Sequence, residues 1–328
     1  PSPGIREVEL YAPDTAPTKA APKGLSWKQG KDTITLRNDG KTVWQYNYGA
    51  KLTKPYFSPI GPINAGDLSW IKPPDHIWHY GLWLSWKTIN GINYWEERPA
   101  GFTKKKSAGK PTRKTAKRPT RKTPAPLASK GDPKPEGTTK IVSTQVAANA
   151  DHSAKITQTL VYHPAKTPEA IVLREERTIA VSAPDNHGGY TLDWTMKFTA
   201  AVDVVLDRTP ISGPNGKPHG GYAGLSMRFA KNFTDWHVIA IDSDKTNLDL
   251  THKPSKGMDF SGTLDGKPCG MAMLDHPTNP RYPSPWYVVL KPEKSFSYFN
   301  AAILCHEPMT IKKGQTVTLR YRVAVHNG

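Results

Sequence analysis

Alternation of apolar and polar residues with a period of two runs through most of this chain and limits the fold more than any other feature. The segments 33–37 and 42–46 both alternate, and Asp39-Gly40 lies between them. An Asp-Gly pair favours a hairpin turn, because glycine tolerates the positive φ that such a turn requires. The same pattern predicts further strands at 155–162, 171–181, 190–200, 224–229, 237–241, 286–290, 297–304 and 316–325.

These strands define the fold class. More than ten short strands without intervening helical patterns indicate two packed antiparallel sheets. The 31 prolines suit long, ordered loops at the edges of such sheets. We predict an all-β fold, an antiparallel β-sandwich in its long, curved supersandwich form. A single domain would cover 24–102 and 138–328, after a Pro/Ala-rich N-terminal segment at 1–23.

The net charge of +17 is concentrated in one segment. Residues 101–140 contain thirteen Lys or Arg and two acidic residues, which leaves +6 for the other 288 residues. The segment 103–137 has almost nothing to bury, so we predict a disordered Lys/Arg/Pro-rich insert. It could tether an anionic polymer or be a tolerated loop insertion. We expect no nucleic-acid binding outside this insert.

The rest of the composition bears on the compartment. No run approaches the roughly 18 apolar residues of a membrane helix, so we expect a soluble protein without membrane insertion. The chain begins at Pro1 without an initiator Met, as a mature protein does after removal of a signal peptide, and we expect it to be secreted or periplasmic. Cys269 and Cys305 fit either a disulfide or two buried thiols.

The densest polar and aromatic cluster lies at 55–97. Asp75 precedes His76 and His79, and such a set serves an acid–base pair, a metal or a hydrogen-bonded loop. Two histidines fall short of the three ligands that a metal site normally has, so we predict no metal ligands. Trp83 and Trp95 follow, and their rings could stack on a sugar.

A second cluster, at 274–286, contains four prolines that exclude regular structure and stiffen the loop. In one interpretation an aspartate orients a histidine, an arginine clamps a carboxylate and a tryptophan stacks on a ring. In the other, the loop is pinned by its own side chains. The residues concerned are Asp275, His276, Asn279, Arg281 and Trp286.

A third cluster, at 174–177, alternates in sign within a predicted strand. Arg174 and Glu176 share one face, and Glu175 and Arg177 share the other. One pair should point into a cleft or the core and the other toward solvent. A plain ladder of ion pairs is the alternative.

Four motifs, at 54–60, 74–83, 90–95 and 275–286, resemble the "methane oxygenase PmoA" family over about residues 32–326. The basic insert lies outside that pattern. The resemblance implies a β-sandwich similar to galactose-mutarotase-like carbohydrate enzymes, rather than the helical membrane subunit that the label suggests. The family shows Asp-His-x-His-His-x-Gly, and Trp78 replaces the first of its adjacent histidines, so only His76 and His79 carry over.

Together these features predict a carbohydrate-active enzyme that transfers protons in elimination, dehydration or hydrolysis of an acidic or modified sugar. The alternatives are a non-catalytic carbohydrate-binding or cell-surface protein and a metal-dependent oxidation. The sequence requires no cofactor, leaves a divalent cation open and does not define the oligomeric state. The predicted catalytic residues are His76, His79, Glu176 and His276. The predicted substrate-binding residues are Asp75, Trp83, Trp95, Arg174, Asp275, Asn279, Arg281 and Trp286.

Overall fold

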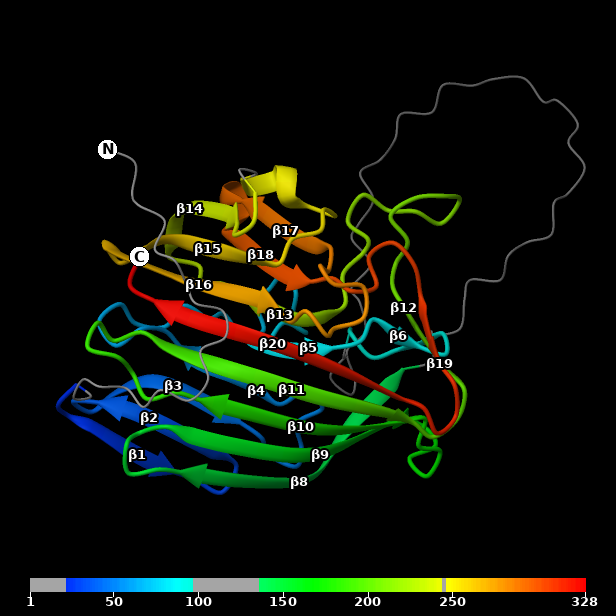
Figure 1. Ribbon diagram of the computed structural model, residues 1–328, viewed down its shortest axis with the longest axis horizontal. Coiled ribbons are helices and arrows are strands. Elements are labelled where there is room, and N and C mark those ends of the chain that lie inside the picture. The colour runs from blue at the N-terminus through cyan, green and yellow to red at the C-terminus, as the bar shows by residue number, and fades with distance from the viewer. Residues whose placement is uncertain (1–21, 97–135, 244–245) are drawn as a thin grey trace, which may run out of the picture.

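The computed structural model describes residues 22–96, 136–243 and 246–328. Nearly all of the predicted N-terminal segment 1–23 and basic insert 103–137 lies outside the described residues. The described chain is all-β, with two large antiparallel sheets in two layers and a small third sheet (Figure 1). The prediction of an all-β antiparallel sandwich is confirmed.

The first sheet has the order β1-β2-β3-β4-β5-β13-β18-β17. Its strands are β1 (Leu25–Gln29), β2 (Thr33–Asn38), β3 (Lys41–Asn47), β4 (Tyr56–Ile60), β5 (Leu82–Ser85), β13 (Gly224–Arg228), β18 (Phe296–Ala301) and β17 (Trp286–Lys291). The predicted hairpin forms between β2 and β3, with Asp39 and Gly40 both at positive φ.

The second sheet has the order β14-β15-β16-β20-β11-β10-β9-β8. Its strands are β14 (Phe233–Ala240), β15 (Gly257–Leu264), β16 (Lys267–Asp275), β20 (Thr316–His326), β11 (Tyr190–Ala200), β10 (Leu173–Val181), β9 (Ala154–Pro164) and β8 (Gly137–Ala148). The β15–β16 hairpin, not predicted from the sequence, turns at Asp265-Gly266 and repeats the Asp-Gly signal.

The remaining elements are short. The small sheet pairs β19 (Met309–Ile311), β12 (Val204–Asp207), β6 (Thr88–Ile89) and β7 (Ile92–Asn93). Two 3-10 turns, η1 (Asn247–Leu250) and η2 (Pro292–Lys294), follow β14 and β17. Among the described residues no helix has the length and apolar character needed to cross a membrane.

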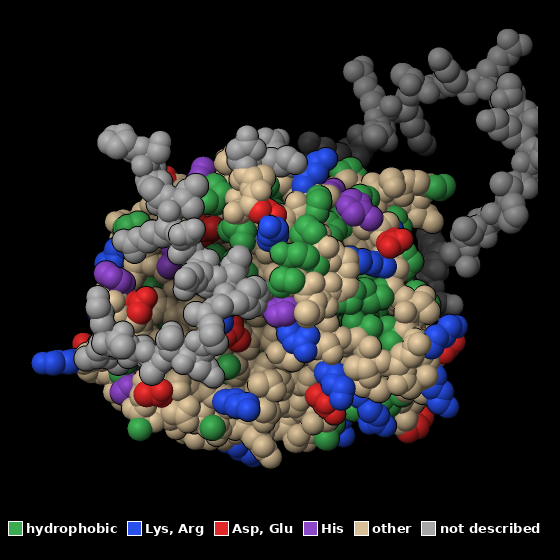
Figure 2. Space-filling model, viewed as in Figure 1, with side chains coloured by type: hydrophobic (Ala, Val, Ile, Leu, Met, Phe, Trp, Pro, Cys, Tyr) green, Lys and Arg blue, Asp and Glu red, His purple; other side chains and the backbone are tan. Residues whose placement is uncertain are grey.

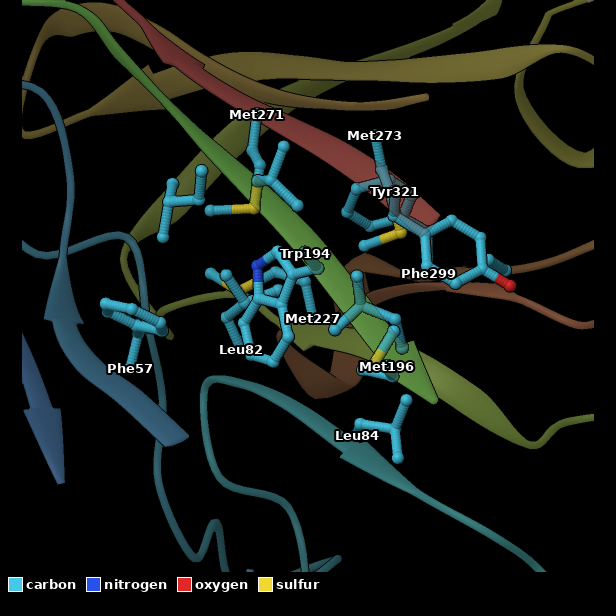
Figure 3. Packing of buried hydrophobic residues seen from close by; sticks show 14 of the residues in the cluster. Phe57, Leu82, Leu84, Trp194, Met196, Met227, Met271, Met273, Phe299 and Tyr321 are labelled. Carbon is cyan, nitrogen blue, oxygen red and sulfur yellow. The ribbon is translucent and has the colours of Figure 1, made fainter. Parts of the chain in front are cut away.

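The core fills the space between the two large sheets. Along β11 every second side chain is buried, including Trp194 and Met196, because successive strand residues point to opposite faces. Trp194 meets Phe57 of β4 edge to face, with 5.8 Å between ring centroids (Figure 3). Met227 of β13 and Phe299 of β18 also belong to this core. The alternation seen in the sequence is therefore the pattern that holds the layers together.

Both cysteines are buried free thiols, so of the two predicted alternatives the structure has the unpaired one. Burial raises the pKa of Cys269 and of Cys305 to about 11, which keeps both thiols protonated near neutral pH. On the face seen in Figure 2, Lys and Arg side chains lie scattered among Asp and Glu side chains. The described surface seen there has no continuous basic face.

The 174–177 cluster divides between the core and solvent, as predicted. Glu175 and Arg177 are buried, 0% and 2% exposed, with 2.6 Å between Oε1 and Nε. The hydroxyl of Tyr162 donates to Glu175 at 2.5 Å, and the Arg177 guanidinium lies 5.5 Å from the centre of the Trp194 ring. An ion pair in an apolar core is costly to break, because the remaining charge is left without a partner.

Glu175→Ala should therefore lower the free energy of unfolding by about 3–5 kcal/mol, since Arg177 stays buried without its carboxylate. Urea denaturation followed by fluorescence measures this change. Glu176→Ala is the matched control, because its ion pair with Lys197 is solvent-exposed and such pairs contribute about 0–1 kcal/mol. Equal losses in the two variants would contradict the assignment.

Candidate functional site

A second aromatic cluster lies on the outer face of the first sheet, away from the core. Phe299 of β18 packs in the core, whereas its neighbour Tyr298 belongs to the outer cluster. Trp83 of β5 lies on the same outer face, and Trp95 packs against it with 5.7 Å between ring centroids. In the described part of the chain the second sheet packs on the other face, and loop residues such as Trp78, Tyr80 and Tyr222 pack against this outer cluster.

A pocket of about 220 Å³ opens within this cluster and is called the histidine pocket below. Its aromatic lining consists of Trp78, Trp95, Tyr222, Tyr287, Phe296 and Tyr298. Its polar lining consists of His76, His79, His219 and Lys291. Pockets for drug-sized ligands usually measure about 300–1,000 Å³, so this one suits a compact ligand such as a single ring.

The loop 75–81 supplies two of the histidines. The backbone N–H of His79 donates to the carbonyl of His76 at 3.0 Å, and the tight turn stacks the two imidazoles with centroids 4.7 Å apart. Gly81 ends the loop at a φ of +70°, where a Cβ atom would come within 2.6 Å of the Phe57 carbonyl oxygen. The loop can cross β4 this closely only because residue 81 is glycine.

Asp75 joins His76 to Arg228 of β13. One carboxylate oxygen, Oδ2, lies 3.0 Å from Nδ1 of His76 and 3.0 Å from Nη2 of Arg228. Arg228 is fully buried, with its guanidinium carbon 3.9 Å from the centre of the Phe296 ring. Burial raises the pKa of Asp75, but the contacts with His76 and Arg228 outweigh it, so the net pKa lies below the usual range. Asp75 is therefore an anion at neutral pH.

His76 is neutral near pH 7. Burial lowers its pKa below the usual 6.5, and the neighbouring Asp75 carboxylate offsets only part of that shift. The ionised carboxylate favours a proton on Nδ1, so Nε2 becomes the basic atom of the ring. A carboxylate-oriented, neutral imidazole at the edge of a pocket has the properties of a general base.

His79 forms an inner wall of the pocket rather than a second exposed base. It is 3% exposed and stacks on Tyr298 with 5.3 Å between ring centroids. Its Nδ1 is buried without a hydrogen-bond partner among the described residues. Burial lowers its pKa well below 6.5, and the positive charges of Arg228 and Lys54, with that of His76 whenever its ring is protonated, add to the shift. His79 is therefore neutral throughout the physiological range.

Glu96 and Lys54 hold the Trp95 side of the pocket. Glu96 pairs with Lys87 and receives a hydrogen bond from the hydroxyl of Tyr222 at 3.4 Å. Lys54, 2% exposed, donates to the carbonyl of Trp95 at 2.5 Å. Neither charged residue is among our sequence candidates, although Lys54 begins one of the quoted motifs and Glu96 directly follows another. Both act here by positioning an aromatic wall.

The sequence candidates missed the contribution of the distant strands. Arg228, Tyr222, Phe296 and Tyr298 come from β13, β18 and the loop that precedes β13. One available signal was the run 296–300, Phe-Ser-Tyr-Phe-Asn, whose alternate residues share a face. That pattern predicts a face but does not say which loop covers it.

Asp275 and Asn279 have structural positions outside the pocket lining. Asp275 accepts hydrogen bonds from the Asn279 amide and from the backbone N–H of Ser284, both at 2.7 Å. Asn279 also accepts from the backbone N–H of Arg320 at 2.7 Å and donates to its carbonyl at 2.6 Å. These polar groups are buried and satisfied by the protein itself. These bonds pin the proline-rich loop, as in the second of the two interpretations, and the substrate-binding role of both residues stays a prediction.

Arg281 and His276 belong to the same pinned loop. Arg281 donates to the backbone carbonyls of Ile303, Glu307 and Pro308 at 2.7–2.9 Å, which occupies the fork that was predicted to clamp a carboxylate. His276 accepts at Nδ1 from the backbone N–H of Thr278 at 3.1 Å. Neither side chain lines the histidine pocket.

Three further candidates lie away from the pocket lining. Trp286 points into the core, where it stacks on Phe299 with 6.1 Å between centroids and donates to the Ser255 carbonyl at 2.9 Å. Arg174 and Glu176 lie on the solvent side of β10, because it is Glu175 and Arg177 that face the core. The structure thus brings together Asp75, His76, His79, Trp83 and Trp95, with Trp83 buried beneath the lining.

A metal site would need further ligands beside the two stacked histidines. Within 22–96, 136–243 and 246–328 no group of three or more His, Cys, Asp or Glu side chains is arranged to hold one. Nδ1 of His76 faces the Asp75 carboxylate, and His79 is stacked between rings. No chemical step below passes through a metal.

Fold and site together define an all-β sandwich protein with a small, aromatic-walled histidine pocket on the outer face of one sheet. Residues 33–328 match the model of a family of unknown function, DUF6807, and the chain belongs to that family. No curated protein matches the chain. The family description assigns no activity, so a function can be inferred only from the chemistry of the pocket.

The depressed pKa of His79 makes folding sensitive to acid. A histidine whose pKa is lower in the folded than in the unfolded protein binds its proton more readily when unfolded, so stability falls as pH drops below about 6.5. The loss grows as the pH falls from 7 toward 5, because the unfolded chain takes up the proton that buried His79 resists. His79→Phe should remove this part of the pH dependence, as urea unfolding at pH 5, 6 and 7 would show. An unchanged slope would contradict the assignment.

Proposed function

We propose that this protein is a carbohydrate-active enzyme that removes a proton from a sugar ring held in the histidine pocket. The observation that carries the proposal is the Asp75–His76 pair, an oriented and neutral imidazole beside a compact aromatic recess. Aromatic faces stack on the C–H faces of sugars, and a positioned base of this type contributes about 10²–10⁴-fold to a rate. The motif resemblance to the "methane oxygenase PmoA" family, which implies a sandwich similar to galactose-mutarotase-like enzymes, favours the same substrate class.

The polar lining favours an acidic sugar. Lys291 and His219 line the pocket, and the lining includes no carboxylate. A uronic acid would therefore find a cation for its carboxylate at Lys291, the role first predicted for Arg174 and Arg281. In an elimination, Nε2 of His76 takes the proton from the carbon next to the carboxylate, and the electron pair of that C–H bond forms a C=C bond. The oxygen substituent on the adjacent carbon leaves with the electrons of its C–O bond and takes a proton from water.

His76→Gln tests the base. The variant should lower kcat by about 10²–10⁴-fold on any acidic oligosaccharide that the wild-type protein converts, with binding nearly unchanged. Formation of an unsaturated product, followed by ultraviolet absorbance, measures the rate, and calorimetry measures the binding. His276→Gln is the control, since that imidazole lies on the pinned loop outside the pocket. Equal activity of His76→Gln and wild type would contradict the proposal.

The second candidate is a non-catalytic carbohydrate-binding protein. The observation that favours it is the pocket lining itself, which offers aromatic rings and cations but no carboxylic acid to protonate a leaving group. A protein that binds acidic sugars on an array but converts none of them would establish this function instead.

Export to the periplasm or the cell exterior, where polymeric glycans occur, belongs to both proposed functions. Cell fractionation tests it.

A further inference from the structure

A larger pocket lies at the open end of the sandwich, between the edge strands β14 and β17. It has a volume of about 690 Å³ and is called the edge pocket here. Thr234 and Trp236 come from β14, and Leu290 comes from β17. Each of these strands ends its sheet, so the pocket opens where the two layers are not joined by a further strand.

The edge pocket adjoins the histidine pocket along one hairpin. Lys291 lines the histidine pocket, and the next residue, Pro292, lines the edge pocket. On the return of the hairpin Ser295 lines the edge pocket, and Phe296 lines the histidine pocket. Successive strand residues point to opposite faces, so Leu290 and the edge pocket lie on the core side of β17, whereas Val289 and the histidine pocket lie on its outer side. The two pockets therefore meet around the hairpin at the edge of the first sheet.

The lining of the edge pocket suits a neutral, hydroxyl-rich ligand. Trp236 is half-buried, and its indole N–H donates to the carbonyl of Phe233 at 2.6 Å, which fixes the ring. The pairing of β14 with β15 is irregular between residues 234 and 237, and bulges of this kind redirect side chains. Lys231 and Asp235 supply one charge of each sign, and the remaining polar lining is hydroxyl and amide groups.

We infer that the edge pocket binds further residues of the sugar chain whose acidic ring occupies the histidine pocket, so that the substrate is an oligosaccharide or polysaccharide. The inference rests on the proposed function and extends it to a substrate longer than one ring. The smaller pocket holds one ring, whereas the edge pocket is about three times as large and carries its own aromatic platform. The sugar chain then passes around the hairpin 291–296, which lies between its two parts.

Binding of oligosaccharides of one to six residues, both uronic-acid-containing and neutral, tests the inference by calorimetry. Wild-type protein should bind the longer members of the recognised series more tightly than the monosaccharide. Trp236→Ala should weaken binding of the longer chains about five- to tenfold and leave the monosaccharide unchanged, because one stacking contact is lost. Trp236→Tyr keeps an aromatic face and should stay close to wild type.

Trp27→Ala is the matched control, since Trp27 is also half-buried but lies on β1, at the opposite edge of the first sheet from β17. The inference is overturned if wild-type protein binds no longer chain more tightly than the monosaccharide, or if Trp236→Ala leaves the chain-length dependence intact. A dependence on Trp236 without turnover of any chain would instead overturn the catalytic proposal and keep the inference. Turnover that depends on His76 but not on chain length would keep the catalytic proposal and overturn the inference about the edge pocket.

Discussion

The central strands of the first sheet, β5, β13 and β18, are buried on both of their faces, and the rest of the molecule depends on that constraint. One face packs against the second sheet through residues such as Met227 and Phe299, while the other carries Trp83, Arg228 and Tyr298 under a cover of loops. A slip of one residue in β18 would exchange Phe299 for Tyr298 and damage core and pocket together. The register of the central strands is therefore fixed by packing on both faces. The strands that pack in the core also hold the side chains of the histidine pocket in place.

Buried charged side chains are paired differently in the core and on the outer face of the first sheet. In the core, Glu175 and Arg177 neutralise each other and meet only buried neighbours. On the outer face, the buried Arg228 is paired with Asp75, which also reaches His76 beside the pocket. The second arrangement places a buried cation behind the carboxylate, so the carboxylate stays ionised and keeps the imidazole in one tautomer. Such a chain of contacts is expected where an imidazole has to be oriented as well as buried.

Much of the fold could be predicted from the sequence, because alternation and Asp-Gly turns are local signals. The loop 75–81 could also be singled out, since its histidines and aspartate are neighbours in the chain. The partners of that loop could not be predicted, because the pairing of β5 with β13 and of β13 with β18 is not encoded in any short pattern. The proline-rich loop 275–286 shows a different limit of prediction from sequence, because its polar residues could be found but their role could not. Its polar residues satisfy one another and the nearby backbone, and from composition alone that set looks the same as a binding site.

The hairpin between β17 and β18 lines both pockets within six residues. Loops generally tolerate insertions and deletions better than the elements they connect. An insertion or deletion here, however, would reshape two recesses in one event, whereas a similar change in the β2–β3 turn would reach neither. Within this family, a change in the length of this hairpin would then alter both pockets together rather than one at a time. On the proposal that one sugar chain occupies both pockets, members that differ in the length of this hairpin should differ in ligand size and in linkage position at the same time.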